Sequence, residues 1–319
     1  MKLHPAGASG LRRNTIGTAI VRPRRASFEA SRRWHIVPVV LVVLAGVVLP
    51  MSVIAIGSLS SPQEWGGIRW GSFSTEAYVR LLYDQDLDGT WMLNVGYAAI
   101  VLRTLVLSGI ATVGCLALGF PAALYVAMQP ARHRTRLLLI ITVPFWTSLV
   151  VRLYAWILLL RSGGVLTSVS DGLFGIGVPS ILYTDAATVI GLVYAFIPFM
   201  VLPIFTSLEH MNWDTVDAAA DLGATPWTVI TNVIVPAAKR GIVSGCALVF
   251  VPSLGAYLIP DMLGGAKSMM LGNLINLQFG DAHNWPVGAA LSIAMCAFVL
   301  VGVLIKHLIV RGCAGENHA

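Results

Sequence analysis

The amino-acid sequence predicts an all-α membrane protein with six transmembrane helices. Of its 319 residues, 56% are hydrophobic and only 11% are charged, whereas a soluble domain carries about 25% charged residues. The mean hydropathy is +0.78. Six separate apolar segments each reach the roughly 20 residues that a helix needs to cross the hydrocarbon of a bilayer. These observations argue against a soluble globular domain.

The first apolar segment follows a basic stretch, as the apolar part of a signal peptide would. Its apolar core is longer than the roughly 7–15 residues of such a peptide, and no small-x-small cleavage site is convincing, so we interpret it as an uncleaved anchor. The chain then divides into a basic N-terminal tail (1–35), a six-helix membrane domain (36–311) and a C-terminal tail (312–319). The six predicted spans are 36–58, 99–128, 137–160, 187–208, 237–260 and 286–310.

The distribution of Lys and Arg predicts the orientation of these spans. Fifteen of them lie in the N-terminal tail, in segments 129–136 and 209–241 and at the C-terminal end, against four in the alternate loops. By the positive-inside rule, both termini are therefore cytoplasmic, and the acidic loop 59–97 faces outward. Because the basic tail lacks a recognition pattern for nucleic acid, we interpret it as an orientation signal near anionic lipid.

One polar segment, 214–236, separates the fourth and fifth spans. Asp214 is a suitable N-cap for a short helix, and Asp217 can complete a capping box with it. Gly223 suits the left-handed residue that ends such a helix. We therefore expect the first half of the segment to be a helix of about two turns that stops abruptly.

The second half of this segment predicts another helix. Thr225 can cap it, a proline is tolerated at its first position, and Pro236 marks its end before the fifth span. The whole segment is thus predicted to be a helix-turn-helix bracket at the cytoplasmic surface. A rigid bracket can transmit a push from a soluble partner, which a flexible loop cannot do.

The spacing of this segment resembles a known motif. Asp217-Ala218-Ala219, Gly223 and Val233-x-Val235-Pro236 are similar to the EAA loop of ABC-type importer permeases, written E-A-A-x3-G-x9-I-x-L-P. The departures, Asp for Glu and Val for Ile and Leu, keep charge or apolar character. VPFWTSLVVRLYAW (143–156), DMLGGAK (261–267) and NWPVGAA (284–290) are similar to the first permease subunit of spermidine/putrescine importers.

This resemblance implies the type I ABC importer permease fold of a bacterial inner membrane, with the EAA loop as a cytoplasmic coupling helix. It also implies three partners, namely a second permease subunit, a pair of ATPase subunits and a periplasmic substrate-binding protein. The sequence has no Gly-Lys pair, so it lacks a Walker A loop. We expect no enzyme activity, metal or cofactor in this chain, with ATP and Mg bound by the ATPase. The residues implied to contact the ATPase are Asp217, Ala218, Ala219, Gly223, Ala224 and Pro236.

Asp261 is the predicted centre of a solute site. The end of the fifth span carries Pro252, Gly255 and Pro260, so we expect a broken helix whose freed carbonyls line a cavity. A carboxylate at membrane depth costs several kcal/mol unless it is paired or solvated, and an ammonium group of a polyamine is a suitable partner. The resemblance also places a substrate-contacting acid here. The alternative is that Asp261 caps the span in water.

Aromatic side chains would complete such a site through cation–π contacts. We predict Trp146, Tyr257 and Tyr194 in this role, with core packing or an interfacial position as the alternative. Arg152 is expected to pair with an acid such as Asp261 or Asp185 or to snorkel outward, and Arg103 to snorkel.

Three other functions stay open at this point. Within the importer class, the solute could be another small cation or an amino-acid-like molecule. A secondary transporter working alone would carry acidic or His residues in several spans, and essentially only Asp261 is found. A membrane scaffold without transport would leave the EAA pattern and the broken span unexplained.

Overall fold

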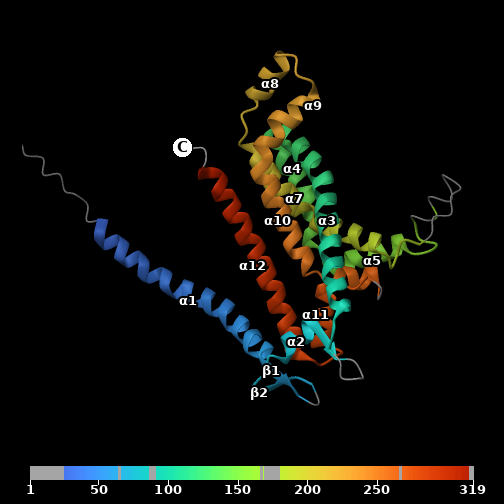
Figure 1. Ribbon diagram of the computed structural model, residues 1–319. Helices are drawn as coiled ribbons and strands as arrows, with labels where there is room; N and C mark the ends of the chain where they lie inside the picture. The colour runs from blue at the N-terminus through green and yellow to red at the C-terminus, as the bar shows by residue number, and fades with distance from the viewer. Residues whose placement is uncertain are drawn as a thin grey trace, which may run out of the picture. The chain divides into compact units, whose positions relative to one another are not determined.

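The computed structural model describes residues 25–63, 66–85, 91–165, 168, 180–265 and 268–315; within these ranges it describes the side chains from residue 38 to 304, except those of 39, 70, 84, 85, 91 and 93. The chain forms two compact units, Met1–Ser52 and Val53–Ala319. The described part of the first unit is helical and belongs to α1 (Arg25–Ser58), which contains Pro38 and Pro50. The second unit holds every other described element (Figure 1).

The second unit is mainly helical. Its α-helices are α2 (Glu76–Leu82), α3 (Val95–Met128), α4 (Ala131–Thr142), α5 (Leu149–Leu160), α7 (Asp185–Glu209), α8 (Asp214–Asp221), α9 (Pro226–Val229), α10 (Val235–Leu254), α11 (Leu271–Phe279) and α12 (Trp285–Gly315). Short helical turns of other types are η1 (Val143–Trp146, 3₁₀), η2 (Ile230–Ile234, π) and η3 (Pro260–Gly264, π). Within the described ranges, five helices are long and apolar enough to cross a membrane, or six if α4 and α5 form one bent span.

The predicted outer loop 59–97 is more ordered than the sequence indicates. It contains two short antiparallel hairpins, β1 (Ser60–Pro62) with β2 (Ile68–Phe73), and β3 (Tyr83–Gln85) with β4 (Trp91–Leu93). Helix α2 lies between these hairpins in the sequence. Strands β1, β3 and β4 have only three residues each, which is too short for a period-2 pattern that sequence could reveal.

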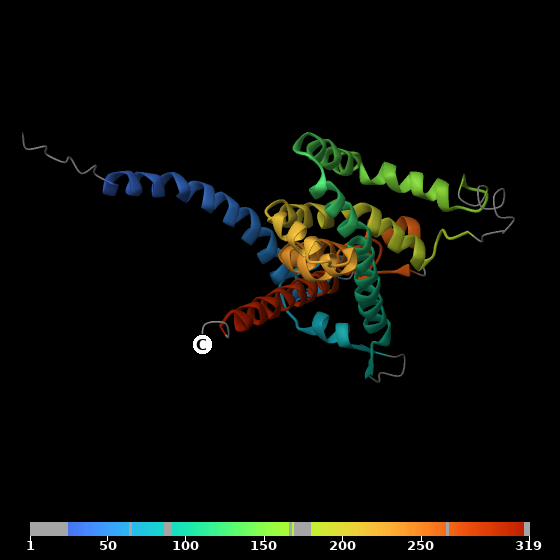
Figure 2. The ribbon, with the colours of Figure 1, turned by 90° about the horizontal axis from the view of Figure 1, so that it is seen from above.

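Helices α3, α7 and α10 pack side by side and form the centre of the second unit (Figures 1 and 2). Small residues permit the close approach. A Cβ added at Gly241 on α10 would lie 2.5 Å from the carbonyl oxygen of Pro203 on α7. The fully buried Met200 packs against Gly119 of α3 and Gly245 of α10. Small residues at helix contacts are typical of membrane proteins, where packing rather than a hydrophobic effect joins the helices.

Two further apolar clusters surround this centre. One joins α5, α7 and η3 through fully buried residues that include Leu153, Leu192 and Leu263. The other joins α2, α11 and α12 through Ala77, Leu274 and Ala290, among others. The first of these clusters matters for function because it holds η3, the segment that carries Asp261.

The predicted third span, 137–160, is not a single straight helix. α4 and α5 meet at an angle of 90°. Pro144 lies at the start of η1 and cannot donate a backbone hydrogen bond, and Thr147 then adopts an extended conformation with ψ of 155°. The apolar run therefore contains a corner, which hydropathy alone does not reveal.

Candidate coupling segment and solute site

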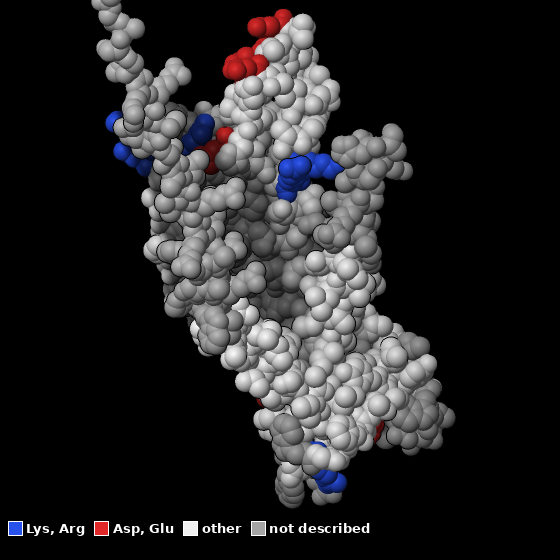
Figure 3. Space-filling model, turned by 90° about the vertical axis from the view of Figure 1, so that its left-hand side faces the viewer, with Lys and Arg blue, Asp and Glu red and all other residues white. Residues whose placement is uncertain are grey.

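Helix α8 forms an exposed tip of the second unit (Figure 1). Its acidic residues, Asp214, Asp217 and Asp221, are all exposed, and Figure 3 shows acidic side chains gathered at this end. The predicted capping box is wrong. Asp214 is the first helical residue, Trp213 occupies the N-cap without a side-chain bond, and the Asn212 side chain accepts from the Asp214 backbone N–H at 3.0 Å. Asp214 and Asp217 lie instead within the first turn of α8, where negative charges interact favourably with the helix dipole.

The predicted joint between α8 and α9 is confirmed. Gly223 has a φ of +80°. Its N–H donates to the Ala220 carbonyl at 2.9 Å, and the Ala224 N–H donates to the Ala219 carbonyl at 3.1 Å, which is the Schellman arrangement of a helix C-terminus. The Thr225 hydroxyl then accepts from the Thr228 N–H at 3.3 Å and caps α9. The turn is therefore rigid.

Pro236 does not end a helix, contrary to the sequence-based expectation. The helical path continues from α9 through η2 into α10, so that Pro226–Leu254 forms one helical path. The Val235 N–H donates to the Ile230 carbonyl five residues back. Such a π turn leaves room for Pro236, whose ring and missing N–H an α-helical register would not accommodate. The second half of the bracket is thus the start of the fifth span.

The bracket has one face toward the core and one toward solvent. Ala219 and Ala224 pack against the α3–α7–α10 cluster, as do Trp213 and Val216. Asp217, Ala218, Gly223 and Pro236 are exposed. Two large apolar side chains, not singled out in the sequence, are also exposed beside them, Leu222 at 89% and Trp227 at 74%. Exposed apolar and acidic groups on a rigid tip are typical of a docking surface.

The fifth span is broken where the sequence predicts it. α10 ends at Leu254, and the chain turns through Gly255 to η3. Asp261 is exposed at the start of η3, and its N–H donates to the Tyr257 carbonyl at 3.0 Å. Its side chain faces a hollow of about 240 Å³ that is also lined by Gly265, Met269, Asn273, Asn276, Leu277 and Asp281.

This hollow has the polarity of a cation site. The described residues that line it include two carboxylates and two carboxamides but no Lys or Arg. Sequence reasoning missed Asn273, Asn276 and Asp281, because they follow the broken span and belong to no charge motif. Asn273 also supports the local backbone, since its amide donates to the Tyr257 carbonyl at 2.9 Å and its oxygen accepts from the Met270 N–H at 3.3 Å.

The structure separates the three predicted aromatic residues. Tyr257 contacts the lining of the hollow through its backbone, because its carbonyl accepts hydrogen bonds from the Asp261 N–H and from the Asn273 side-chain amide. Trp146 lies in η1 and is 85% exposed, free to contact a solute or another subunit. Tyr194 is on α7, where its ring packs against Trp156 at 5.5 Å between centroids. None of the three is shown to share one site with Asp261.

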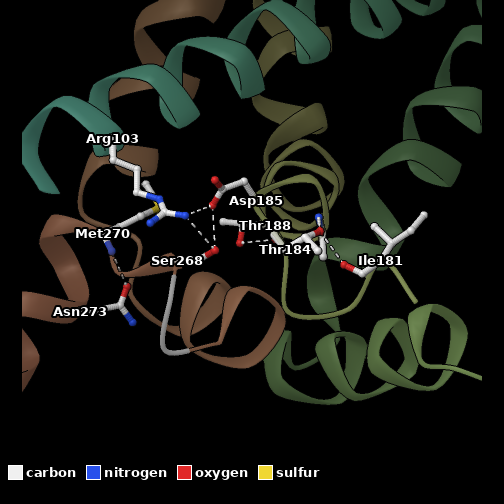
Figure 4. Close-up of polar contacts among 9 residues, drawn as sticks. Arg103, Ile181, Thr184, Asp185, Thr188, Ser268, Met270 and Asn273 are labelled. Carbon is white, nitrogen blue, oxygen red and sulfur yellow. Dashed lines mark hydrogen bonds and ion pairs between the residues drawn. The ribbon is translucent and has the colours of Figure 1, made fainter. Parts of the chain in front are cut away.

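The structure gives both arginines contacts that the sequence did not predict. Arg152 pairs with neither Asp261 nor Asp185. Its guanidinium carbon lies 5.9 Å from the ring centroid of Phe145 and 5.7 Å from that of Tyr194, so the protein's own cation occupies the aromatic face that we predicted for a solute. Arg103 forms an ion pair with Asp185 at the start of α7, a partner that the sequence analysis did not assign to it (Figure 4). In the part of the chain that the structure describes, no group of three potential metal ligands is found.

Comparison with known proteins identifies the class. Residues 117–314 match the family of the binding-protein-dependent transport system inner membrane component, and the chain belongs to this family. It is a permease subunit of an ABC importer with the type I fold and not an enzyme, and ATP hydrolysis in such an importer belongs to a separate subunit.

Curated relatives and a solved structure support this assignment. The chain is 36% identical over 230 residues to the spermidine/putrescine transport system permease protein PotB of Escherichia coli K12, covering 72% of this chain and 82% of the relative. It is 38% identical over 217 residues to the protein of the same name from Haemophilus influenzae, covering 68% and 75%. A bacterial alginate ABC transporter in complex with its pentasaccharide-bound periplasmic protein has a TM-score of 0.66 at 18% identity, covering 91% of this chain and 98% of the solved one. This last likeness concerns the fold alone.

Proposed function

We propose that this chain forms half of the wall of a pathway that imports polyamines, spermidine or putrescine, by alternating access. The observation that carries the proposal is the hollow beside η3, in which the described lining includes Asp261 and Asp281 without a basic residue. A polyamine carries several ammonium groups joined by methylenes, and two carboxylates with carboxamide oxygens suit that pattern of charge. The names of the two relatives above support polyamine over other cations.

The rest of the importer follows from the same proposal. The chain pairs with a second permease subunit in the bacterial inner membrane, with its termini in the cytoplasm, and a periplasmic binding protein delivers the solute. ATPase subunits, which hold ATP and Mg, dock on the exposed face of α8 and on Leu222 and Trp227. Because Ala219, Ala224 and Val229 belong to the same apolar cluster as α3, α7 and α10, motion of the docked ATPase reaches three spans through direct packing.

The test is ATP-dependent uptake of labelled spermidine by the reconstituted complex of both permeases, the ATPase and the binding protein. Unlabelled putrescine, amino acids and thiamine serve as competitors. Competition by putrescine alone supports a polyamine site. Uptake that amino acids or thiamine abolish, or ATP hydrolysis without spermidine uptake, would transfer the substrate assignment to another small solute.

A further inference from the structure

A network of polar contacts joins three segments that are distant in the sequence. Arg103 on α3 forms an ion pair with Asp185, the first residue of α7, and both contact Ser268, which follows η3 (Figure 4). The Ser268 hydroxyl donates to the Asp185 carboxylate at 2.7 Å and accepts from the Arg103 guanidinium at 3.3 Å. We call Arg103, Asp185 and Ser268 the clamp. The clamp joins Asp185 to Arg103, which lies 82 positions earlier in the sequence, and to Ser268, which lies 83 positions later.

The clamp holds a hydroxyl that has little contact with water. Ser268 is only 1% exposed, so its hydrogen-bonding capacity is met by the protein, and removing a partner leaves a buried polar group unsatisfied. Arg103 and Asp185 are about one third and one half exposed. Their Coulomb attraction is therefore partly screened by water. The hydrogen bonds to the buried serine, more than the ion pair, hold the three segments together.

Further contacts from α3, from α7 and from the residues just before α7 hold the chain on either side of Ser268. Before it, the Tyr183 N–H donates to the Leu263 carbonyl at 2.8 Å, and the backbone of Gly264 lies so close to Thr188 that an added Cβ would be 2.5 Å from the hydroxyl. After it, the buried Thr104 hydroxyl accepts from the Leu271 N–H at 2.8 Å. The start of α7 and the outer part of α3 thus hold both η3 and the start of α11.

The solute hollow is built from these same two segments. Asp261 belongs to η3 and Asn273 to α11. None of the clamp residues lines the hollow. Gly265, which does line it, has a φ of +66° and lies between Asp261 and the clamp. Met269, which also lines the hollow, directly follows Ser268 in the chain, so a change at the clamp reaches the hollow through adjacent backbone.

We propose that the Arg103–Asp185–Ser268 clamp positions the solute-binding acid Asp261 relative to Asn273, and so sets the affinity of the pathway for its cation without contacting it. The proposal rests on the proposed function above. Arg103 and Asp185 are positioning residues in this scheme, and Ser268 transmits their hold to η3 and α11.

The first test uses Ser268→Ala, which removes the link and leaves the ion pair. We expect the KM for spermidine uptake by the complete reconstituted complex to rise about three- to tenfold, the range for the net contribution of one ordinary hydrogen bond, because the two charged partners are partly exposed and screened. The maximal rate and the amount of assembled complex should stay at the wild-type level. Arg103→Gln and Asp185→Asn should give the same pattern, and Arg103→Lys, which keeps the charge, a smaller rise.

A matched control is present in the same part of the chain. Arg80 and Glu76 of α2 form another exposed ion pair, at 2.7 Å, and neither lines the hollow beside η3. Arg80→Gln should leave the KM unchanged. An equal rise in KM in this control would show that the effect is general loss of outer charge, and would overturn the proposal.

A second measurement does not depend on the identity of the solute. Amide hydrogen exchange of η3 and the start of α11 in the intact complex should become faster in Ser268→Ala and stay unchanged in Arg80→Gln. If the wild-type complex fails to import spermidine, the proposed function is wrong, while the exchange data still decide on the clamp. Unchanged exchange and unchanged KM in Ser268→Ala would refute it. So would a lower maximal rate and less complex at constant KM, which is what a purely structural contact predicts.

Discussion

Gly223 offers the sharpest test of the coupling segment. Its φ of +80° is one that L-residues rarely adopt, yet a Cβ placed there meets no atom within 4 Å. A substitution therefore adds backbone strain and no steric clash with the rest of the protein. Gly223→Val and Gly223→Asn differ mainly in how well each residue tolerates this backbone, because Asn visits the left-handed region and a β-branched residue does not.

The magnitude follows from the conformation. A left-handed residue with a Cβ costs about 1–2 kcal/mol, which lowers the population of the native turn by roughly five- to thirtyfold relative to alternatives. The hydrogen bonds from Gly223 and Ala224 to α8 depend on this turn. In Gly223→Val, α8 should lose its fixed angle to α9, while the spans and their buried core stay intact.

The assay compares ATP hydrolysis with solute uptake in the reconstituted complex. We expect Gly223→Val to insert into the membrane normally and to lose most uptake per ATP hydrolysed, with Gly223→Asn close to wild type. Gly71→Val is a control, since Gly71 also has a positive φ, +89°, and open space around its Cβ but lies in strand β2. Full coupling in Gly223→Val, or equal damage by Asn and Val, would refute the reasoning.

Three other predictions concern the site, the docking surface and the core. Asp261→Asn should weaken polyamine uptake far more than assembly of the complex, as measured by uptake and co-purification; unchanged uptake would make the acid structural. Ala at both Leu222 and Trp227 should reduce ATPase binding to the permeases by about tenfold or more, as expected for exposed anchors of an interface, without lowering thermal stability. Gly241→Ala should destabilise the protein by about 1–3 kcal/mol through overpacking, whereas Gly109→Ala, where the Cβ has open space, should not; equal melting temperatures would contradict the tight crossing of α7 and α10.

The sequence was sufficient to predict those features of the fold that depend only on residues adjacent in the chain. The joint at Gly223, the cap at Thr225 and the break after Gly255 are confirmed, since each depends on intrinsic backbone preferences or on short side-chain hydrogen bonds. The capping box failed for a related reason: Asn212, two residues upstream, offers its side chain to the same backbone. The prediction that Pro236 ends a helix was wrong because a π turn accommodates the proline ring. We relate this π turn to tertiary packing, since Val229 and Ile234 on either side of it lie in the core.

The sequence by itself determined the class of protein, its apolar helices, the bracket that resembles a coupling loop, and the acid at the broken span. These depend on composition, hydropathy and local backbone chemistry, which are properties of contiguous residues. Only the tertiary structure decided that Arg103 pairs with Asp185 and that Arg152 lies over Tyr194 and Phe145. It also placed Asp281 beside Asp261 in one hollow. Such contacts arise where α3, α5, α7, η1 and the chain around η3 pack together, and no local pattern specifies which of several charges will meet when these segments come together.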